Sequence, residues 1–569
     1  MKEDLIFSDY PFIVPTQKRT VNKLESLIQD LRECGSALTA HLAIKHWNKY
    51  MDELQTEFSI IYALYSGDTR NKAYKKAQDA ADELYPLVNK YVIDFQKILA
   101  KAKYRKELER KYGKFYFKKI DFSLKSFDEK ILNESIEENK LVSKYSEILG
   151  TAKIEFRGEI LNLPQLGKYM QDNDRETRKE AAIAMDKWLG EHDEELGEIY
   201  SQLVTLRDGM AKKLGFKNYV ELGYIKMGRY DYDQKKVAAY RKQIEEDVVP
   251  LCKKLYKAQF KNLGIKNPKY YDLALDFLSG NPVPAGNEDY LVKAAKKMYH
   301  SLSSEAGVFF DYMVSHELLD LTARPGKQPG GYCTFFPKYG APYIFSNFNG
   351  TAGDVDVLTH EGGHAFEAFV TRDFKLPEYR DPTMETAEIH SMSMEFFAWP
   401  YAKEFFGKDA EKYRYSHLAN AIEFLPYGVC VDHFQHWVYE HPKATHAERC
   451  AAWKELETRY NPERQFGEEL PNLSRGIFWL RQSHIFGSPF YYIDYTLAQV
   501  IAFQYLIMDH KNHLKAWKSY IKLLKCGGKL PFCELLEHNH LKNPFEEGSL
   551  KKIMAGCEKI LKEFDISKF

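Results

Sequence analysis

The residues whose types and spacing could do chemistry form the run His360-Glu361-Gly362-Gly363-His364. Its two histidines are four positions apart, so on a helix both imidazoles lie on one side, a turn from each other. That spacing lets two neutral ring nitrogens bind one zinc ion. Glu361 follows the first histidine and would project beside the metal, where it can act as general base on a water molecule. The run therefore predicts half of a zinc-dependent hydrolytic site.

The composition of this run favours a metal site over a chance match. Paired histidines on a helix are often ordinary surface residues, and a pattern with so few fixed positions also occurs in unrelated proteins. Gly362 and Gly363, however, each cost a helix about 1 kcal/mol relative to alanine, so a sequence selected only for helix stability would not carry them. We expect them to let another backbone approach, with the β-prone segment just before the run as the neighbour, and to open a way for a substrate strand.

A third metal ligand is expected downstream, because a catalytic zinc takes three protein ligands and a water molecule. The candidate carboxylates are Glu378, Glu385, Glu388 and Glu395. Glu388 and Glu395 are seven positions apart (395−388) in a helical segment and share a face. We expect Glu388 as the third ligand and Glu395 as the partner that orients a ligand imidazole; Glu385 is the alternative. His390 points away from Glu388 by about 200° at 100° per residue and is not expected to be a ligand.

A second group of chemically capable side chains lies in residues 484–495, HIFGSPFYYIDY. His484 precedes a Gly-Ser-Pro turn, and Tyr491, Tyr492 and Tyr495 follow it. Tyr492 and Tyr495 are three apart and can share a helix face. The chain has 39 tyrosines, so aromatic packing explains the cluster if it is taken alone. Beside a zinc site, imidazole and phenol donors are suited to stabilising the oxyanion formed in peptide hydrolysis.

The elements that must position these residues are mostly helices. Apolar residues repeat at three and four positions through most of the first 270 residues and again after residue 383. Strand signals gather at residues 324–350, where short β-prone runs are bounded by proline and glycine. We therefore expect a mainly α protein with a hairpin or small sheet directly before the helix that carries His360.

The bulk composition excludes several classes of function. The chain has 569 residues, 44% hydrophobic and 28% charged, as in a globular protein with a large core. Basic and acidic residues balance at 81 each, so no overall field attracts nucleic acid or anionic membranes. No apolar run approaches the length of a membrane span, and no secretory signal is seen. The eight cysteines are scattered without a CxxC pair, which favours a reducing cytoplasm.

One basic segment could indicate a different function. Residues 97–119 carry ten Lys or Arg interleaved with aromatic residues, a pattern that nucleic-acid-binding surfaces also show. Glu107 and Glu109 interrupt it, and the chain is neutral overall. A solvated helix face is therefore the favoured interpretation, and we expect neither nucleic-acid nor membrane partners.

Three motifs together resemble one known family. HEGGH, the segment AEIHSMSME that contains Glu388, and the 484–495 run are similar to the thimet oligopeptidase and oligoendopeptidase F family of zinc metallopeptidases, most of all to its oligoendopeptidase F branch with the Pz-peptidases. The likeness extends, less specifically, to residues 172–188 and 207–224. In the thimet branch Ala-Pro stands where this chain has Ile389-His390, and the tyrosine run is spaced differently, so which tyrosine faces the metal stays open.

The resemblance implies a bowl-like, two-lobed helical fold with a deep central channel. We place an N-terminal helical lobe at residues 1–190 and a catalytic lobe at 191–569, joined in one continuous body. The resemblance implies one zinc ion per chain, with ligands His360, His364 and Glu388, and Glu361 as the base. It further implies that the 484–495 run stabilises the oxyanion and holds the substrate; of its tyrosines we favour Tyr492 and Tyr495 beside His484 for the oxyanion.

The expected substrates are short unstructured oligopeptides, hydrolysed by water attack. An extended peptide would add as a strand to the edge of the small sheet, with Gly330, Gly331 and Tyr332 as binding residues and Tyr491 as a further contact. The channel implied by the resemblance would exclude folded proteins. The sequence leaves the cleavage specificity, the physiological substrate and the oligomeric state undetermined.

Overall fold

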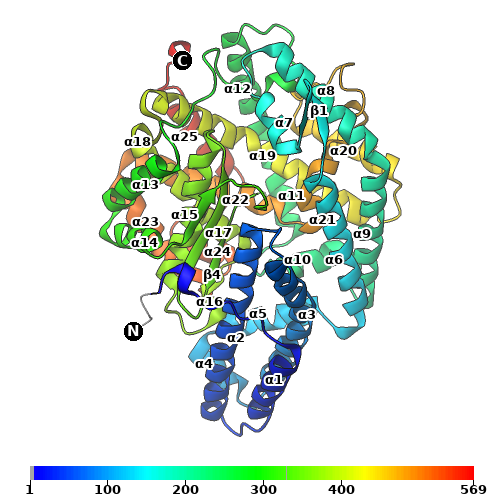
Figure 1. Cartoon of the computed structure of the whole chain (residues 1–569), viewed down its shortest axis with the longest axis vertical. Helices are drawn as coiled ribbons and strands as arrows, with labels where there is room; N and C mark the ends of the chain where they lie inside the picture. The colour runs from blue at the N-terminus through cyan, green and yellow to red at the C-terminus, as the bar shows by residue number, and fades with distance from the viewer. Residues whose placement is uncertain (1–4, 329) are drawn as a thin grey trace. The chain divides into compact units, whose positions relative to one another are not determined.

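The computed structural model describes residues 5–328 and 330–569 and consists mostly of helices (Figure 1). The predicted mainly α class with one small sheet near residues 324–350 is confirmed. By internal contacts the chain forms two compact units. The first unit is Met1–Glu129, Val283–Gly407 and Met508–His540, and the second is Lys130–Pro282, Lys408–Ile507 and Leu541–Phe569. Both draw on each of the lobes expected from the sequence, whose boundary at residue 190 stays a prediction.

The first unit contains the sheet and the helices around it. Its α-helices are α1 Gln17–Arg32, α2 Ala37–Gly67, α3 Lys72–Ala100, α4 Arg105–Tyr112, α5 Lys114–Ser126, α13 Glu288–Leu302, α14 Ser304–Ser315, α15 Gly353–Thr371, α16 Pro377–Arg380, α17 Met384–Phe397, α18 Ala402–Phe406, α23 His513–Leu524 and α24 Phe532–His538. Its strands are β3 Leu319–Thr322, β4 Tyr332–Phe336 and β5 Ala341–Phe348.

The second unit is helical apart from one small hairpin. Its α-helices are α6 Leu132–Gly150, α7 Leu163–Tyr169, α8 Arg175–Glu191, α9 Asp193–Lys213, α10 Tyr219–Lys226, α11 Gln234–Gln243, α12 Val249–Asn262, α19 Ala410–Glu440, α20 His446–Tyr460, α21 Ser483–Gly487, α22 Tyr492–Lys511 and α25 Ser549–Leu561. A π-helical turn, Ile244–Val248, joins α11 to α12. The hairpin pairs β1 Ile154–Phe156 with β2 Glu159–Leu161, and the last residues of α22 belong to the first unit.

Helices α1, α2 and α3 show why this sequence folds locally as it does. Ser36 caps α2 in a capping box with Thr39, and the Asn71 side chain caps α3, so the first N–H groups of both helices have acceptors. The helices bury apolar faces against one another; Trp47 of α2 stacks on Phe95 of α3 with ring centroids 4.0 Å apart. The basic segment at 97–119 spans the end of α3, α4 and part of α5, and Arg105 within it pairs with Glu109 and Asp121.

The three-stranded sheet has the order β3-β5-β4, so β4 is an edge strand. β5 pairs in parallel with β3 and antiparallel with β4, with Tyr332 opposite Phe345. The turn after β5 is held by Asp354, whose carboxylate accepts the backbone N–H groups of Asn349 and Gly350 at 2.9 and 2.7 Å. Helix α15 begins beside that turn, at Gly353. The sheet therefore leads directly into the helix that carries the histidine run.

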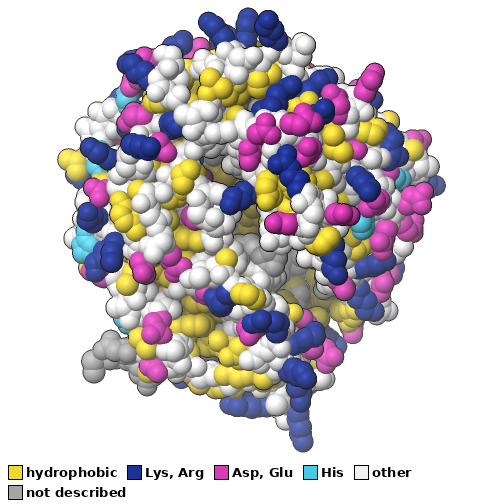
Figure 2. Space-filling model, turned by 45° about the horizontal axis from the view of Figure 1, so that its top comes forward, with side chains coloured by type: hydrophobic (Ala, Val, Ile, Leu, Met, Phe, Trp, Pro, Cys, Tyr) yellow, Lys and Arg dark blue, Asp and Glu magenta, His cyan; other side chains and the backbone are white. Residues whose placement is uncertain are grey.

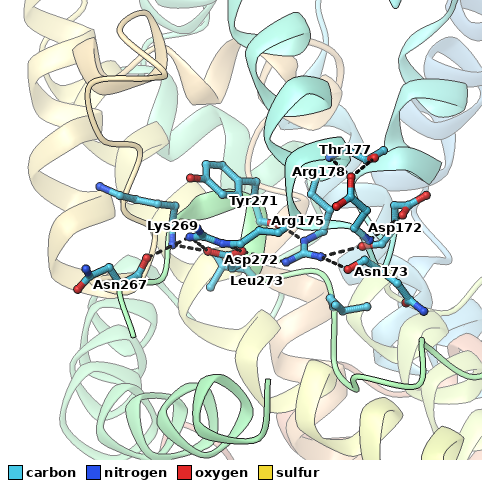
Figure 3. Close-up of polar contacts among 12 residues, drawn as sticks. Asp172, Asn173, Arg175, Thr177, Arg178, Asn267, Lys269, Tyr271, Asp272 and Leu273 are labelled. Atoms are coloured by element: carbon cyan, nitrogen blue, oxygen red, sulfur yellow. Dashed lines mark hydrogen bonds and ion pairs between the residues drawn. The ribbon is translucent and has the colours of Figure 1, made fainter. Parts of the chain in front are cut away.

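A buried charge cluster organises part of the second unit (Figure 3). Asp272 is fully buried and accepts hydrogen bonds from Arg175 and Arg178 of α8, at 2.7–2.9 Å, and from the backbone N–H of Lys269 at 2.9 Å. Burial alone would raise the pKa of the Asp272 carboxyl, but these donors hold it below its ordinary value. The cluster fixes the turn at residues 269–273 against α8.

Helix apolarity and surface charge were compared over the described part of the chain. Among residues 5–328 and 330–569, no helix combines the length and apolarity that a bilayer crossing requires. On the face drawn in Figure 2, basic and acidic side chains are interspersed rather than gathered into one patch.

Candidate metal centre

Helices α15 and α17 pack closely enough to place side chains from both at one point. A Cβ on Gly363 would lie 2.6 Å from the carbonyl oxygen of His390 and from Cα of Ser391, so only glycine permits this approach. A Cβ on Gly362 would meet the Tyr299 hydroxyl of α13. The expectation that the sheet is the neighbour of these glycines, and that they open a way for a substrate strand, is therefore wrong. Both positions are filled, and Gly363 sets the distance between the two helices.

Three side chains converge across this helix pair. The Nε2 atoms of His360 and His364 lie 3.3 and 3.6 Å from Oε2 of Glu388. Their ligand atoms all lie within 4.8 Å of one another, as one metal ion requires. The two imidazoles and the carboxylate are the residues singled out by spacing, and the tertiary structure brings them together.

The surroundings of Glu388 and His360 orient the donor atoms. Nδ1 of His360 donates to Oε1 of Glu395 at 2.6 Å, which directs Nε2 toward Glu388. The Ser391 hydroxyl donates to Oε2 of Glu388 at 3.0 Å. The Glu388 side chain is 4% exposed, whereas both histidines keep about a fifth of their surface. The group is thus buried on the α17 side and reachable on the α15 side.

The two imidazoles differ in their affinity for protons. Burial would lower the pKa of His360, but hydrogen bonds to Glu388 and Glu395 raise it well above its ordinary value. Burial lowers the pKa of His364, and the neighbouring His360 lowers it further. The carboxylates of Glu388 and Glu395 give this region a negative potential, which a divalent cation would occupy in exchange for a proton.

Glu361 is half-buried on α15, next to His360 in sequence. Burial raises the pKa of the Cys333 thiol on β4 far above its usual range, and the Glu361 carboxylate is the next largest cause. Glu361 therefore acts electrostatically on the edge strand β4. The predicted base, the predicted ligands and the predicted peptide-binding edge all belong to the first unit.

The other acidic and histidine candidates are placed elsewhere. Among the described residues, Glu388 rather than Glu385 belongs to the three-donor group, although Glu385 is also buried. Glu378 lies on the short helix α16, where burial raises its pKa. His390 is buried; burial and then the His364 imidazole lower its pKa to about 3, so its ring is neutral.

The predicted sheet-edge residues lead into β4. Gly330 has a φ of +102°, which glycine tolerates, and its carbonyl accepts from the Asn347 side chain at 2.9 Å. Gly331 is exposed, and a Cβ there would be 3.4 Å from the carbonyl oxygen of Phe345. The Tyr332 ring stacks on Phe345 with centroids 4.8 Å apart. Their role in binding a peptide stays a prediction.

The histidine–tyrosine cluster forms in the second unit. Nε2 of His484 lies 3.4 Å from the Tyr495 hydroxyl, and its ring meets that of Tyr492 with centroids 4.9 Å apart. Tyr491 packs beside Tyr495, with centroids at 4.9 Å. Gln482 contacts Nδ1 of His484 at 2.9 Å. The four predicted residues therefore make one cluster, and their action on a substrate stays a prediction.

Sequence reasoning missed the residues that hold this cluster's turn. Phe490 has a φ of +67°; its carbonyl accepts from Arg229 at 2.8 Å and its N–H donates to Gln435 at 3.0 Å. Arg229 also pairs with Asp494 at 2.5 Å, where both side chains are almost fully buried. These partners are distant in sequence, and no local pattern marks them.

A second three-donor group was missed as well. Asp193, His446 and Cys450 of the second unit also place their ligand atoms within 4.8 Å of one another. The spacing of His446 and Cys450, four apart on α20, is a signal that could have indicated half of it.

Two family models and several solved structures match this chain. Residues 7–127 match the peptidase M3 N-terminal domain, and residues 292–555 match peptidase family M3. A solved structure of Pz peptidase A with an inhibitor is 44% identical, with TM-score 0.95, covering 99% of this chain and 100% of that one. An oligoendopeptidase F structure from Bacillus anthracis, described as putative, is 42% identical, with TM-score 0.90 and 99% of each chain covered.

A more distant structure shares the fold alone. Oligoendopeptidase F from Enterococcus faecium is 15% identical, with TM-score 0.64 and 96% of each chain covered. A search of curated proteins finds no match. The family match at residues 292–555 spans both the sheet and the α15–α17 pair, where two imidazoles and a carboxylate could hold a metal ion. The chain therefore belongs to peptidase family M3 and is a metalloendopeptidase.

Proposed function

We propose that this metalloendopeptidase uses one zinc ion and hydrolyses short unstructured oligopeptides, with Glu361 as general base. The observation that carries the proposal is the convergence of His360, His364 and Glu388, with ligand atoms within 4.8 Å and Glu361 adjacent on the same helix. Two imidazole nitrogens and one carboxylate oxygen are the donor set of hydrolytic zinc enzymes, which leaves a position for water.

The hydrogen bonds made by the proposed ligands also suit a zinc ion. Glu395 accepts a hydrogen bond from the Nδ1–H group of His360, the arrangement that raises the basicity of a ligating imidazole. Zinc, when bound, supplies Lewis-acid chemistry, polarising the peptide carbonyl and making water acidic near neutral pH. Nitrogen-rich sites of this kind also bind other divalent transition metals, so the identity of the ion is part of the proposal.

Glu361 performs the proton transfers. It accepts a proton from the attacking water and delivers it to the amine that leaves when the peptide bond breaks. Its side chain is half-buried and near the edge strand β4, where an extended peptide would add by main-chain hydrogen bonds. Gly330 and Gly331 present little side-chain bulk beside that edge, and Tyr332 and Tyr491 would contact the substrate.

His484, Tyr492 and Tyr495 are proposed to stabilise the oxyanion. The His484–Tyr495 contact at 3.4 Å and the packing of Tyr492 hold the three side chains in one cluster. Burial raises the pKa of the Tyr492 phenol, which keeps it protonated and able to donate. A donor of this kind contributes roughly 3–4 kcal/mol to transition-state stabilisation.

The setting we propose is the cytoplasm. None of the eight cysteines, all within the described residues, forms a disulfide, and Cys34, Cys333, Cys526 and Cys533 are only partly buried. Reduced thiols at such positions suit a compartment kept reducing.

The decisive experiment measures metal content and cleavage of a quenched fluorescent oligopeptide for wild type and Glu361→Gln. We expect Glu361→Gln to hold as much zinc as the wild type but to lose cleavage, because the base is removed and the ligands remain. Wild-type cleavage by Glu361→Gln would remove Glu361 from the mechanism. Tyr492→Phe and Tyr495→Phe should each lower kcat without loss of zinc. An unchanged kcat in both variants would show that these tyrosines serve only in aromatic packing. A folded protein substrate, offered in parallel, should not be cleaved.

A further inference from the structure

Asp193, His446 and Cys450 bring three different donor types together in the second unit, in a group that belongs neither to the peptidase site nor to the tyrosine cluster. Asp193 opens helix α9, while His446 and Cys450 are one turn apart at the start of α20, which packs against α9. Nε2 of His446 lies 2.6 Å from Oδ1 of Asp193 and 3.6 Å from Sγ of Cys450.

These separations can be compared with those around a tetrahedral zinc. With usual bond lengths, two ligands on one ion are roughly 3.6 Å apart for sulfur and nitrogen and roughly 3.3 Å apart for nitrogen and oxygen. The Cys450–His446 distance of 3.6 Å already matches. The His446–Asp193 distance of 2.6 Å is that of a hydrogen bond, and has to open by well under 1 Å when an ion takes the proton's place.

The site is shaped for the imidazole and has a route to solvent. A Cβ on Gly197, one turn after Asp193 on α9, would lie 2.7 Å from the His446 ring, so only glycine leaves this space. Cys450 and Asp193 are buried at 6% and 7% exposure. The His446 side chain is 26% exposed and forms the accessible side.

A fixed outer contact orients the carboxylate. Arg475 pairs with Oδ2 of Asp193 at 3.0 Å, while Oδ1 faces His446. A carboxylate that binds a metal through one oxygen is commonly oriented in this way, by a neighbouring donor that hydrogen-bonds its other oxygen. Thiolate and carboxylate together carry two negative charges, which balance those of a divalent ion; the guanidinium groups of Arg475, on Asp193, and of Arg449, near Cys450, add positive charge around them.

We propose that Asp193, His446 and Cys450 form a second metal site, which takes a zinc-class divalent ion and joins α9 to α20. Sulfur, nitrogen and oxygen donors in this combination suit zinc and cobalt and are poor for calcium or magnesium. The ion would replace the His446 and Cys450 protons, and its fourth position would be open to solvent on the His446 side. The site is independent of the peptidase chemistry, because its three ligands all lie outside the unit that holds His360.

Cobalt(II) tests this site directly, because only a thiolate ligand produces a sulfur-to-cobalt charge-transfer band in the near ultraviolet. The peptidase group has no cysteine ligand. Metal-depleted full-length chain is titrated with Co²⁺ alone, and bound cobalt is counted after desalting. We expect two equivalents and the charge-transfer band in wild type. Cys450→Ser should lose the band and one equivalent but keep peptide cleavage, and Glu388→Ala should keep the band.

A matched control and a second variant keep the test decisive. Cys557→Ser removes another buried thiol of the second unit, outside both three-donor groups of the described residues, and should leave the band and both equivalents unchanged. If Cys450→Ser does not fold, as judged by circular dichroism, Asp193→Asn takes its place in the test. This variant retains the thiol, and its affinity for the second equivalent of cobalt should be at least tenfold lower than that of the wild type. The proposal would be overturned if folded wild type bound one equivalent of cobalt without the band, or if the band survived in folded Cys450→Ser. The three residues would then be an ion pair between Asp193 and His446 with a neighbouring Cys450 thiol.

Discussion

Two buried carboxylates, Glu388 in the first unit and Asp272 in the second, have opposite surroundings. Asp272 is met by two guanidinium groups and a backbone N–H, all of them donors that cannot bind a metal (Figure 3). Glu388 is met by two imidazoles and a hydroxyl, and each imidazole can exchange its proton for a metal bond. Burial is nearly the same for both.

The difference teaches that the type of donor around a buried carboxylate, more than its burial, separates a structural site from a chemical one. The arginines around Asp272 carry permanent charge and lock the residue into one state. The histidines around Glu388 leave it able to receive a cation. Four changes would break or sharpen this contrast.

The largest effect is expected from Glu388→Ala. Loss of the proposed third ligand should reduce zinc affinity and kcat/KM by more than the roughly 10–100-fold that follows loss of a residue hydrogen-bonded to a ligand. Metal analysis and peptide cleavage measure both quantities. Glu385→Ala is the matched control, since Glu385 is buried three positions earlier on the same helix, and it should keep its metal. If Glu385→Ala lost the metal and Glu388→Ala kept it, Glu385 would be the third ligand.

Asp272→Ala should affect stability and leave the metal in place. Removing the carboxylate leaves Arg178 buried without its anionic partner, which costs about 3–5 kcal/mol of unfolding free energy. Urea unfolding followed by circular dichroism measures the loss. The control is Glu191→Gln, which breaks an exposed ion pair with Lys187 at the end of α8, the helix that carries Arg178. It should cost less than about 1 kcal/mol of unfolding free energy. Equal losses in the two variants would contradict the distinction.

Glu395→Gln tests the outer contact on the metal side. The amide is a poorer acceptor for the His360 Nδ1 proton, so zinc affinity should fall about 10–100-fold while the metal-free fold is unchanged. Competition with a zinc chelator gives the affinity. Unaltered zinc affinity would show that Glu395 does not act through His360.

The smallest effect concerns acid. Because the pKa of Asp272 is lower in the folded state than its usual value of about 3.9, the unfolded chain binds more protons. The contribution of Asp272 is therefore fully present above about pH 4. It is lost as the pH falls through the lower folded pKa.

Asp272→Asn should accordingly weaken the fall of stability below about pH 4, as measured by urea unfolding across the acid range. Zinc should leave at higher pH than this, because the proposed histidine ligands bind it only when they are deprotonated. If the protein unfolded at a higher pH than that at which zinc is released, this expected order would be wrong.

The sequence by itself determined the elements and the kinds of donor. Periodicity predicted the helices, and proline and glycine bounded the short strands near residue 340, because both signals depend on neighbours in the chain. The four-residue spacing of His360 and His364 and the seven-residue spacing of Glu388 and Glu395 each placed two side chains on one helix face. Such relations follow from helix geometry alone.

Only the tertiary structure decided what lies across from each face. It placed the backbone at His390 over Gly363 where the sequence suggested the sheet, put Glu388 rather than Glu385 beside the imidazoles, and brought Asp193 to His446 across more than 250 residues. These outcomes depend on how separate helices pack, and packing is set by the combined shapes of many distant side chains. A one-dimensional pattern does not encode that sum.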